Sequence, residues 1–265
     1  MKKIKVFQII AICLLIISGC SKENDNPTFE DMPIVEGYLY AGQPLEIKIS
    51  RQVPYAYDAV YSSDNIDSLS VNVFDGNLYY DLIPIGDGKY TNTNIDLSQF
   101  NTLEVKFKFN NAAVSAKTII PEKPKNFVSS ASTIYVSDDI LTLNNPDELE
   151  FSWDNPDASY YFLLIENMES NPTSIFDNEN ISNINQLFKL TPTQSDHYSM
   201  KTRRFSYYGN HRIILYHINP DVAALYEESD NTSQNIINPP SEIENGFGIF
   251  SGINADTLYV NVLPL

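Results

Sequence analysis

The side chains best suited to acid–base or metal chemistry in this chain of 265 residues are its three histidines, His197, His211 and His217. His211 and His217 lie six residues apart in a segment that is expected to form a strand. Both therefore face the same side, but at about 3.3 Å per residue they would lie roughly 20 Å apart. Two imidazoles so far apart cannot bind one metal ion, and the histidines predict no metal site.

Sequence motifs for other chemistry do not occur either. The sequence contains no HExxH motif, no cysteine cluster and no GxSxG nucleophile elbow, and no Ser/His/Asp spacing supports a catalytic triad. The glycine-rich stretch GFGIFSG (246–252) lacks the Lys-Ser/Thr that follows a phosphate-binding loop. The acidic turns SDDI (137–140) and GDGK (86–89) lack the spacing of an EF-hand. We therefore predict no catalytic, cofactor-binding or metal-binding residue and a protein that is not an enzyme.

Cys20 is the one residue whose position predicts a covalent modification. The apolar run 6–17 follows three lysines and is shorter than the roughly 20 residues of a membrane span, which is typical of a secretory signal peptide. Residues 17–20 (ISGC) resemble a bacterial lipobox, whose cysteine is lipidated and becomes the first residue of the mature chain. An ordinary signal peptide with a chance cysteine is the alternative. Cys13 lies in the removed segment, so the mature chain would contain no disulfide.

Residues 21–32 (SKENDNPTFEDM) are polar and without periodicity, and we expect a flexible tether. The start of this segment, with Lys22, Glu23 and Asp25, resembles the lipoprotein export signal of the Bacteroidota, although Asn24 interrupts it. The resemblance implies an outer-membrane protein that faces the cell surface, with a periplasmic orientation as the alternative.

The chain is strongly acidic, with 17 Lys and Arg against 34 Asp and Glu and a formal net charge of -17. Removing residues 1–20, which hold three lysines and no acid, would change the charge to -20. A field of this sign disfavours nucleic acid and anionic lipid as partners. Hydrophobic residues make up 43% of the chain, which excludes wholesale disorder.

Alternation of apolar and polar residues predicts an all-β fold with one or two short helices. In the segment 45–51, Leu45, Ile47 and Ile49 face one way and polar residues the other, as in a half-buried strand. The same reasoning predicts strands over 33–40, 69–75, 78–85, 89–95, 103–110 and 113–120, with a hairpin turn at 86–88. We expect an immunoglobulin-like β-sandwich over residues 33–121.

The sequence PEKP (121–124) predicts a joint, because two prolines stiffen the chain and remove ladder donors. A second, fibronectin type III-like sandwich is expected over 125–265. In it Trp153 is expected in the core, with ligand stacking as the alternative. Four further elements are predicted: a short helix or insertion near 181–188, a hairpin that turns at 209–210, a helix that begins at 219–221 and ends near Ser229, and a last strand at 256–265.

Two tyrosine-rich stretches are the candidate surfaces for contact with a partner. The first is VPYAYDAVY (53–61) and the second FSYYGNH (205–211). Tyrosine has an apolar face and a polar tip, which suits protein contacts and sugar stacking. Half-buried tyrosines of ordinary strands are the alternative. The residues proposed for contact are Tyr55, Tyr57, Tyr61, Tyr207 and Tyr208.

The order of several short motifs resembles one family of Bacteroidota lipoproteins, known as domain of unknown function 4249. The last block, INPPSEIENGFGIFSG, is the most specific, because Asn235-Ile236, Gly246, Gly248 and Phe250 match the family pattern. Glu244-Asn245 depart from it where a second glycine is usual. The other motifs are PIVEGYL, Gly-Lys-Tyr at 88–90, TIIPEKP, FSWDNPDASYY and Asn-Pro at 219–220.

This resemblance implies a lipoprotein that assists a TonB-dependent outer-membrane receptor, since such receptors are often encoded beside family members. It assigns no catalytic residue. The expected function is that of a non-catalytic binding or accessory subunit of a TonB-dependent transporter or envelope complex, anchored through Cys20. The alternative is a surface adhesive or glycan-binding module without a transporter partner.

Overall fold

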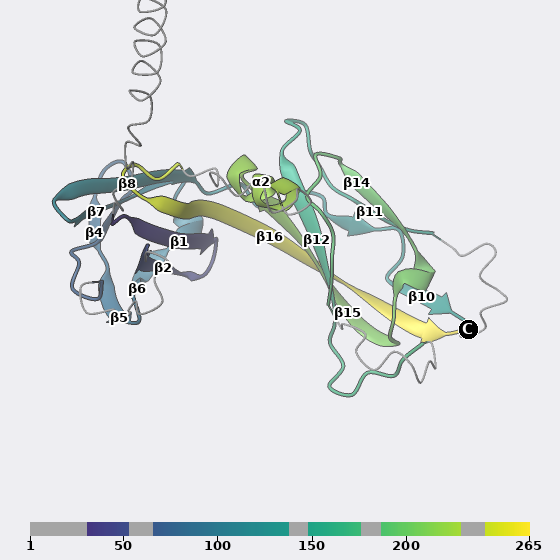
Figure 1. Ribbon diagram of the computed structural model, residues 1–265. Helices are drawn as coiled ribbons and strands as arrows, with labels where there is room; N and C mark the ends of the chain where they lie inside the picture. The colour runs from purple at the N-terminus through teal and green to yellow at the C-terminus, as the bar shows by residue number, and fades with distance from the viewer. Residues whose placement is uncertain (1–30, 53–65, 138–147, 176–186, 229–241) are drawn as a thin grey trace, which may run out of the picture. The chain divides into compact units, whose positions relative to one another are not determined.

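The structure is a computed structural model that describes residues 31–52, 66–137, 148–175, 187–228 and 242–265. Strands dominate these residues, and they form two tandem β-sandwiches (Figure 1). The prediction of an all-β fold in two tandem sandwiches is therefore confirmed.

The first sandwich contains the strands β1 to β8. Its core lies between the β1–β2–β6–β5 part of a large sheet and a separate four-stranded sheet in the order β4–β3–β7–β8. Val35, Leu45 and Leu103 are among its fully buried side chains. The strands are β1 (Pro33–Tyr40), β2 (Pro44–Arg51), β3 (Asn72–Phe74), β4 (Tyr79–Asp81), β5 (Ile83–Gly86), β6 (Lys89–Asp96), β7 (Thr102–Phe109) and β8 (Ala112–Ile119), and a 3-10 helix, η1 (Leu97–Gln99), precedes β7.

The second sandwich contains the strands β9 to β16. Its core lies between the β13–β12–β15–β16 part of the large sheet, to which β10 adds, and a three-stranded sheet in the order β14–β11–β9. Trp153 is 4% exposed and lies in this core, as predicted. The strands are β9 (Val128–Ser129), β10 (Thr133–Val136), β11 (Glu148–Ser152), β12 (Tyr160–Asn167), β13 (Leu187–Lys189), β14 (His197–Lys201), β15 (Gly209–Ile218) and β16 (Phe247–Pro264).

Strand β16 belongs to both sandwiches. Its first part pairs in parallel with β1, from Ile34 opposite Phe247 to Tyr40 opposite Ile253. Its later part pairs antiparallel with β15 and parallel with β10. The predicted ranges 33–121 and 125–265 differ from this arrangement, because residues 247–253 complete the first sandwich. A single nine-stranded sheet thus runs through both (Figure 1).

Close approach between β1 and β16 depends on glycine. Gly248 has a φ of 113°, and a Cβ atom there would lie 2.0 Å from the carbonyl oxygen of Val35. Only a residue without a side chain adopts this conformation and leaves this space.

The helix α2 (Pro220–Glu228) covers part of the outer face of the nine-stranded sheet. It begins where the sequence predicted, with Pro220 at its first position and Asp221 in its first turn, where a carboxylate complements the positive helix end. Val222 and Ala223 pack against Ile249 and Ile253 of β16, which forms a third, smaller core.

Several predicted element boundaries are wrong. No hairpin turns at residues 209–210, because β15 begins at Gly209 and pairs with β12 and β16, whereas β14 lies in the other sheet. Of the helix or insertion predicted near 181–188, Leu187 and Phe188 lie in the strand β13, and residues 181–186 lie outside the described residues. The segment 78–85 contains two strands in different sheets, and the two stretches at 246–252 and 256–265 form one strand.

Candidate functional site

Side chains of β15 and β16 form hydrogen bonds and an ion pair with the joint between the sandwiches. The Asn254 amide donates to the Pro121 carbonyl at 2.9 Å, and the His217 ring nitrogen Nδ1 donates to the Glu122 carbonyl at 2.8 Å. Lys123 forms an ion pair with Asp256 at 2.9 Å. Polar backbone groups of the proline-rich segment thus find partners in the large sheet.

Asn219, which directly precedes α2, holds the start of this joint. Its Nδ2 lies 2.8 Å from the carbonyl oxygen of Ile119 and 3.2 Å from Oγ1 of Thr118. Ser251 Oγ and the Gly252 carbonyl of β16 each lie 3.3 Å away. One amide therefore links the end of β8, the helix start and the shared strand.

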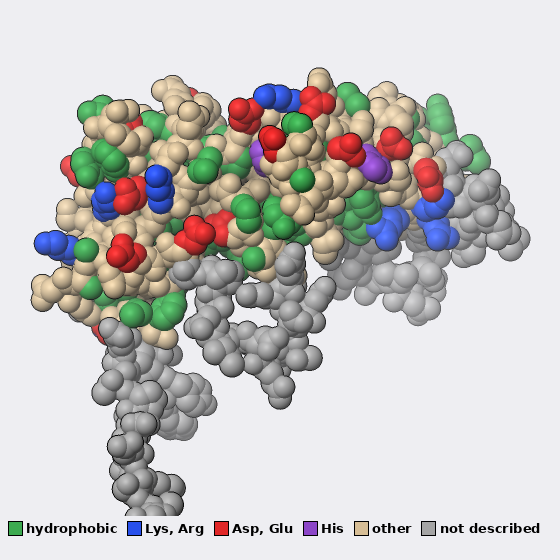
Figure 2. Space-filling view, turned by 90° about the horizontal axis from the view of Figure 1, so that it is seen from above, with side chains coloured by type: hydrophobic (Ala, Val, Ile, Leu, Met, Phe, Trp, Pro, Cys, Tyr) green, Lys and Arg blue, Asp and Glu red, His purple; other side chains and the backbone are tan. Residues whose placement is uncertain are grey.

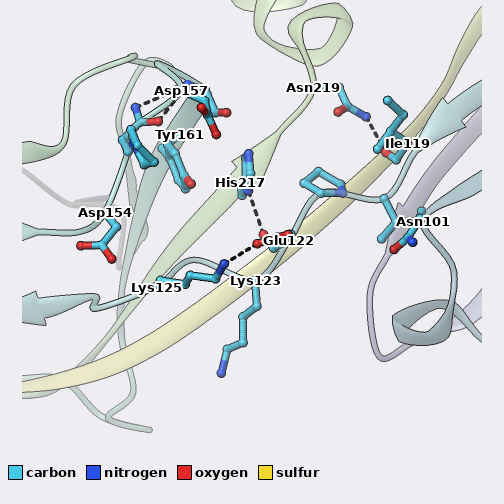
Figure 3. Close-up of a pocket in the computed structure, with 15 residues that line it drawn as sticks. Asn101, Ile119, Glu122, Lys123, Lys125, Asp154, Asp157, Tyr161, His217 and Asn219 are labelled. Carbon is cyan, nitrogen blue, oxygen red and sulfur yellow. Dashed lines mark hydrogen bonds and ion pairs between the residues drawn. The ribbon is translucent and has the colours of Figure 1, made fainter.

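A polar pocket of about 750 Å³ lies beside this joint (Figure 3). Its size is within the range of small-molecule sites. The ring of Tyr161 on β12 stacks on the ring of His217 on β15, with centroids 4.5 Å apart and planes inclined by 21°. Glu122 and Lys125 of the joint, paired at 2.5 Å, lie at its rim. We call it the joint pocket.

The acidic side of the joint pocket is the loop between β11 and β12. Asn155 fixes this loop, because its Nδ2 donates to the Ser159 carbonyl at 3.0 Å and its Oδ1 accepts from the Ser159 amide at 2.8 Å. Asp154 accepts a hydrogen bond from the Asn126 amide at 2.7 Å, and Asp157 lines the pocket from the same loop.

Burial controls the protonation of both stacked rings. It raises the pKa of Tyr161, and the charges of Asp154, Asp157 and Glu122 raise it further. Burial lowers the pKa of His217, although the Glu122 carbonyl and carboxylate oppose this change. Both rings are therefore neutral near pH 7, and His217 carries its proton on Nδ1, which donates to Glu122.

A second candidate is the outer face of the nine-stranded sheet, which tyrosine rings line beside α2 and beyond it. The register of β1, β10, β12, β15 and β16 puts alternate residues of these strands on this one face. Tyr38, Tyr135 and Tyr259 are 42%, 57% and 56% exposed. We call this surface the tyrosine face, and its tyrosines are Tyr38, Tyr40, Tyr135, Tyr160, Tyr216, Tyr226 and Tyr259.

Close to α2, the rings of the tyrosine face form a continuous cluster. Tyr216 stacks on Phe162 with centroids 4.7 Å apart, and Tyr40 meets Tyr216 edge-on at 6.3 Å. The Lys189 ammonium lies 4.3 Å from the ring centroid of Tyr226, a cation–π contact. Burial raises the pKa of Tyr40 and of Tyr216, and a neighbouring phenol raises each further.

A hollow of about 550 Å³ adjoins the tyrosine face at β1 and β2. Tyr38 and Tyr40 line it together with Gln43, and the ion pair between Lys89 and Glu46, 3.1 Å long, lies at its side. Aromatic rings next to amide and charged groups suit a polar ligand with an apolar face.

The tyrosines singled out from the sequence have other positions. Tyr208 packs against the second core, and its hydroxyl donates to the Val136 carbonyl at 3.2 Å. Tyr207 pairs with Ser174 in an isolated bridge. Neither lies on the tyrosine face. Tyr55, Tyr57, Tyr61 and the lipidation residue Cys20 lie outside the described residues.

The histidines have separate environments, and none is placed with a second histidine. His211 is 3% exposed beside Asn167, His217 lies in the joint pocket, and His197 pairs with Asp196 at 2.7 Å. Across the described ranges, no group of three or more His, Cys, Asp or Glu side chains could hold a metal ion. The same part of the chain has no helix that is long and apolar enough to cross a membrane.

Charge over the molecule follows the acidic composition. Figure 2 shows Asp and Glu side chains spread over one face, with Lys and Arg side chains in small groups beside them.

Comparison with protein families gives a match over most of the chain. The family described as "Domain of unknown function (DUF4249)" matches residues 22–258. The chain belongs to this family. No curated protein matches the sequence.

Solved structures of tandem immunoglobulin and fibronectin domains are similar to this DUF4249 protein at low identity. Domains A168–A170 of titin match with 9% identity and a TM-score of 0.22, over 72% of this chain and 62% of that chain. The FN1–FN3 domains of chicken CNTN1 match with 11% identity and a TM-score of 0.27, over 88% of this chain and 66% of that chain. The matched region thus spans about two thirds or less of either structure.

Proposed function

We propose that this DUF4249 protein is a lipoprotein that acts by binding, as a non-catalytic accessory subunit of an outer-membrane TonB-dependent transporter or envelope complex. Lipidation at Cys20 would anchor it, and residues 21–32 would act as the tether. We propose an orientation toward the cell surface.

The tyrosine face is the observation that carries this proposal. Tyrosine is enriched at protein–protein interfaces, because a rigid ring covers apolar area while its hydroxyl stays compatible with water. Tyr135 and Tyr259 are each more than half exposed and project from neighbouring strands of one sheet. A sheet face that presents exposed tyrosine rings is suited to contact with a folded partner.

Recovery of partners from native outer membranes tests the proposal. Full-length lipidated protein is purified beside the variants Tyr135→Asp and Tyr259→Asp, and mass spectrometry identifies what is recovered. Tyr79→Asp is the matched control, because Tyr79 is 61% exposed on β4, away from the tyrosine face. Cys20→Ala tests the anchor.

We expect a barrel receptor to be recovered in stoichiometric amount with the unchanged protein and with Tyr79→Asp. The amount of recovered receptor should be at least tenfold lower with Tyr135→Asp and with Tyr259→Asp. Absence of any barrel from membranes that contain the protein would refute the accessory role. Equal recovery with all variants would show that the tyrosine face is not the contact surface.

The hollow beside Tyr38 and Tyr40 favours a second candidate function, a glycan-binding surface module. Its tyrosine rings and its Gln43, Glu46 and Lys89 groups are of the kind that stack on and hydrogen-bond to sugars. A glycan array with the full-length chain tests this function, and the Tyr38→Ala variant should lose any signal. Binding without a barrel partner would favour this candidate.

A further inference from the structure

The joint pocket contains a tyrosine hydroxyl with no assigned role, which is open to the pocket although the residue itself is buried. Tyr161 is 5% exposed, and among the described residues its hydroxyl has no hydrogen-bond partner. Figure 3 shows this hydroxyl pointing into the space bordered by Asp154, His217 and Glu122. Because this hydroxyl opens onto the pocket, it can hydrogen-bond to a ligand group that enters there.

The charges around this hydroxyl are unbalanced. Lys125 is paired with Glu122, and Lys123 is paired with Asp256. Asp154 and Asp157, whose charges act on the Tyr161 hydroxyl, have no ion-pair partner within the described ranges. Two carboxylates therefore line the pocket without forming an ion pair in the described part of the chain, although the charge of Asp154 also acts on Lys125.

The walls beside the carboxylates are aromatic. The faces of Tyr161 and His217 are stacked on each other, and the proton on His217 Nδ1 is donated to the joint, so the imidazole is neutral near pH 7. The attraction for a cation therefore comes from the carboxylates, and the neutral rings beside them add no positive charge that would repel it.

We propose that the joint pocket binds an organic cation through an ammonium or guanidinium group. The Tyr161 hydroxyl accepts a hydrogen bond from an N–H of this group, and Asp154 and Asp157 supply the opposite charge. Charge-assisted hydrogen bonds of this kind are stronger than neutral ones. The volume of about 750 Å³ leaves room for a chain or ring attached to the cationic group. This ligand site is independent of the partner surface proposed above.

The cation could belong to a free small amine or to a Lys or Arg side chain of a peptide. Calorimetric titration of the full-length chain in detergent distinguishes the two sources. One arm uses agmatine, and the other uses the peptide acetyl-Gly-Gly-Arg-Gly-Gly-amide. Pentanol, which carries no charge, is the neutral control ligand. We expect at least one cationic probe to bind with one site per chain and pentanol not to bind.

Two pairs of variants show whether binding takes place in the pocket. Tyr161→Phe removes only the hydroxyl and should weaken binding by roughly 10- to 100-fold, as expected for a hydrogen bond to a charged group. Its matched control, Tyr160→Phe, removes a hydroxyl from the opposite face of the same strand. Asp157→Asn should weaken binding about tenfold, whereas Asp81→Asn changes the net charge equally on β4 and should leave binding unchanged.

The outcomes are decisive in either direction. Binding of agmatine alone identifies a free amine, binding of the peptide alone identifies a chain-borne cation, and binding of both identifies the cationic group itself as the ligand. No binding of either probe to the folded chain overturns the proposal. If Asp157→Asn and Asp81→Asn weaken binding of the cationic probe equally, the proposal is also overturned. The probe would then be attracted by the net negative charge of the protein and not by the pocket.

Discussion

Asn219 joins three segments of the chain with a single amide group. Because its Nδ2 is shared among Thr118, Ile119, Ser251 and Gly252, the Asn219→Ala variant leaves acceptors near the joint without a donor. We expect the free energy of unfolding to fall by about 1–3 kcal/mol. Urea denaturation measures this change. Asn77→Ala, at an exposed turn position, should change it by less than about 0.5 kcal/mol.

His211 should make the protein less stable in mild acid. Its ring lies between the Gly209 carbonyl, 3.1 Å from Nδ1, and the Asn167 amide, 3.3 Å from Nε2, which fixes the neutral tautomer. Burial lowers its pKa in the native state. Below about pH 6.5 the unfolded chain therefore binds more protons than the native chain, and the free energy of unfolding falls as the pH falls.

The measurement is urea denaturation at pH 7.5 and pH 5.5. We expect the loss of stability between these values to be smaller in His211→Gln than in the unchanged protein. His197→Gln is the control, because the pH dependence that His197 gives to stability has the opposite sign. Asp196 raises the pKa of His197, so the stability that the charged His197 contributes is lost as the pH rises. A loss that is unchanged in His211→Gln would show that His211 does not titrate as described.

The residues of the two candidate sites are the hardest to predict from the sequence. In the sequence, His217 is notable only for its six-residue spacing from His211, whereas its contact with the joint depends on the packing of Glu122 against β15. Tyr161 has the sequence pattern of an ordinary strand residue, and only the folded structure shows that it lines one pocket together with Asp157. The tyrosine face is spread over five strands and a helix, so no window of the sequence contains it.

The pairing of β1 with β16 should tolerate no side chain at Gly248. Gly248→Ala would both strain the backbone and bring a Cβ atom against the Val35 carbonyl. We expect the free energy of unfolding to fall by roughly 3 kcal/mol or more. Gly42→Ala is the matched control, since Gly42 has a φ of 79° but open space around it, and it should cost about 1 kcal/mol.

Thermal and urea denaturation of the two glycine variants check this prediction. Similar losses in both would mean that backbone conformation alone matters and that β1 and β16 can move apart at little cost.

The strands of the first sandwich could be predicted because one of their faces is buried. In β2 and β7 the burial alternates residue by residue, so the sequence pattern and the strand coincide. Prediction failed where a partner strand decides the boundary. Asn210 has the type of a turn residue, but it lies in β15 and pairs with Asn261 of β16. The break at Leu82 places β4 and β5 in different sheets.

The two sandwiches should unfold together, because β16 and the fastened joint tie them into one unit, Met32–Leu265. Leu103→Ala in the first core and Leu163→Ala in the second should each lower the free energy of unfolding by about 2–5 kcal/mol. Calorimetry of both variants and of the unchanged chain should give one transition. Two separate transitions, with each variant shifting only one of them, would contradict this expectation.

The tandem arrangement was predictable from the proline-rich joint, but the shared strand was not. Two short alternating stretches separated by polar residues resemble separate elements, and only the pairing of residues 254–257 with β15 makes them continuous. Long-range pairing of this kind is the part of a β fold that local pattern reveals least.

The chain is synthesised from its N-terminus, but its first strand cannot complete its pairing until nearly the whole chain has been made. Strand β1 emerges first, yet its parallel neighbour, from Phe247 to Ile253, is among the last segments to appear. Until that segment has been synthesised, the edge of β1 stays open and can pair with other chains. A chain truncated before Phe247 would leave one edge of β1 unpaired. The C-terminal residues are therefore needed to complete the first sandwich.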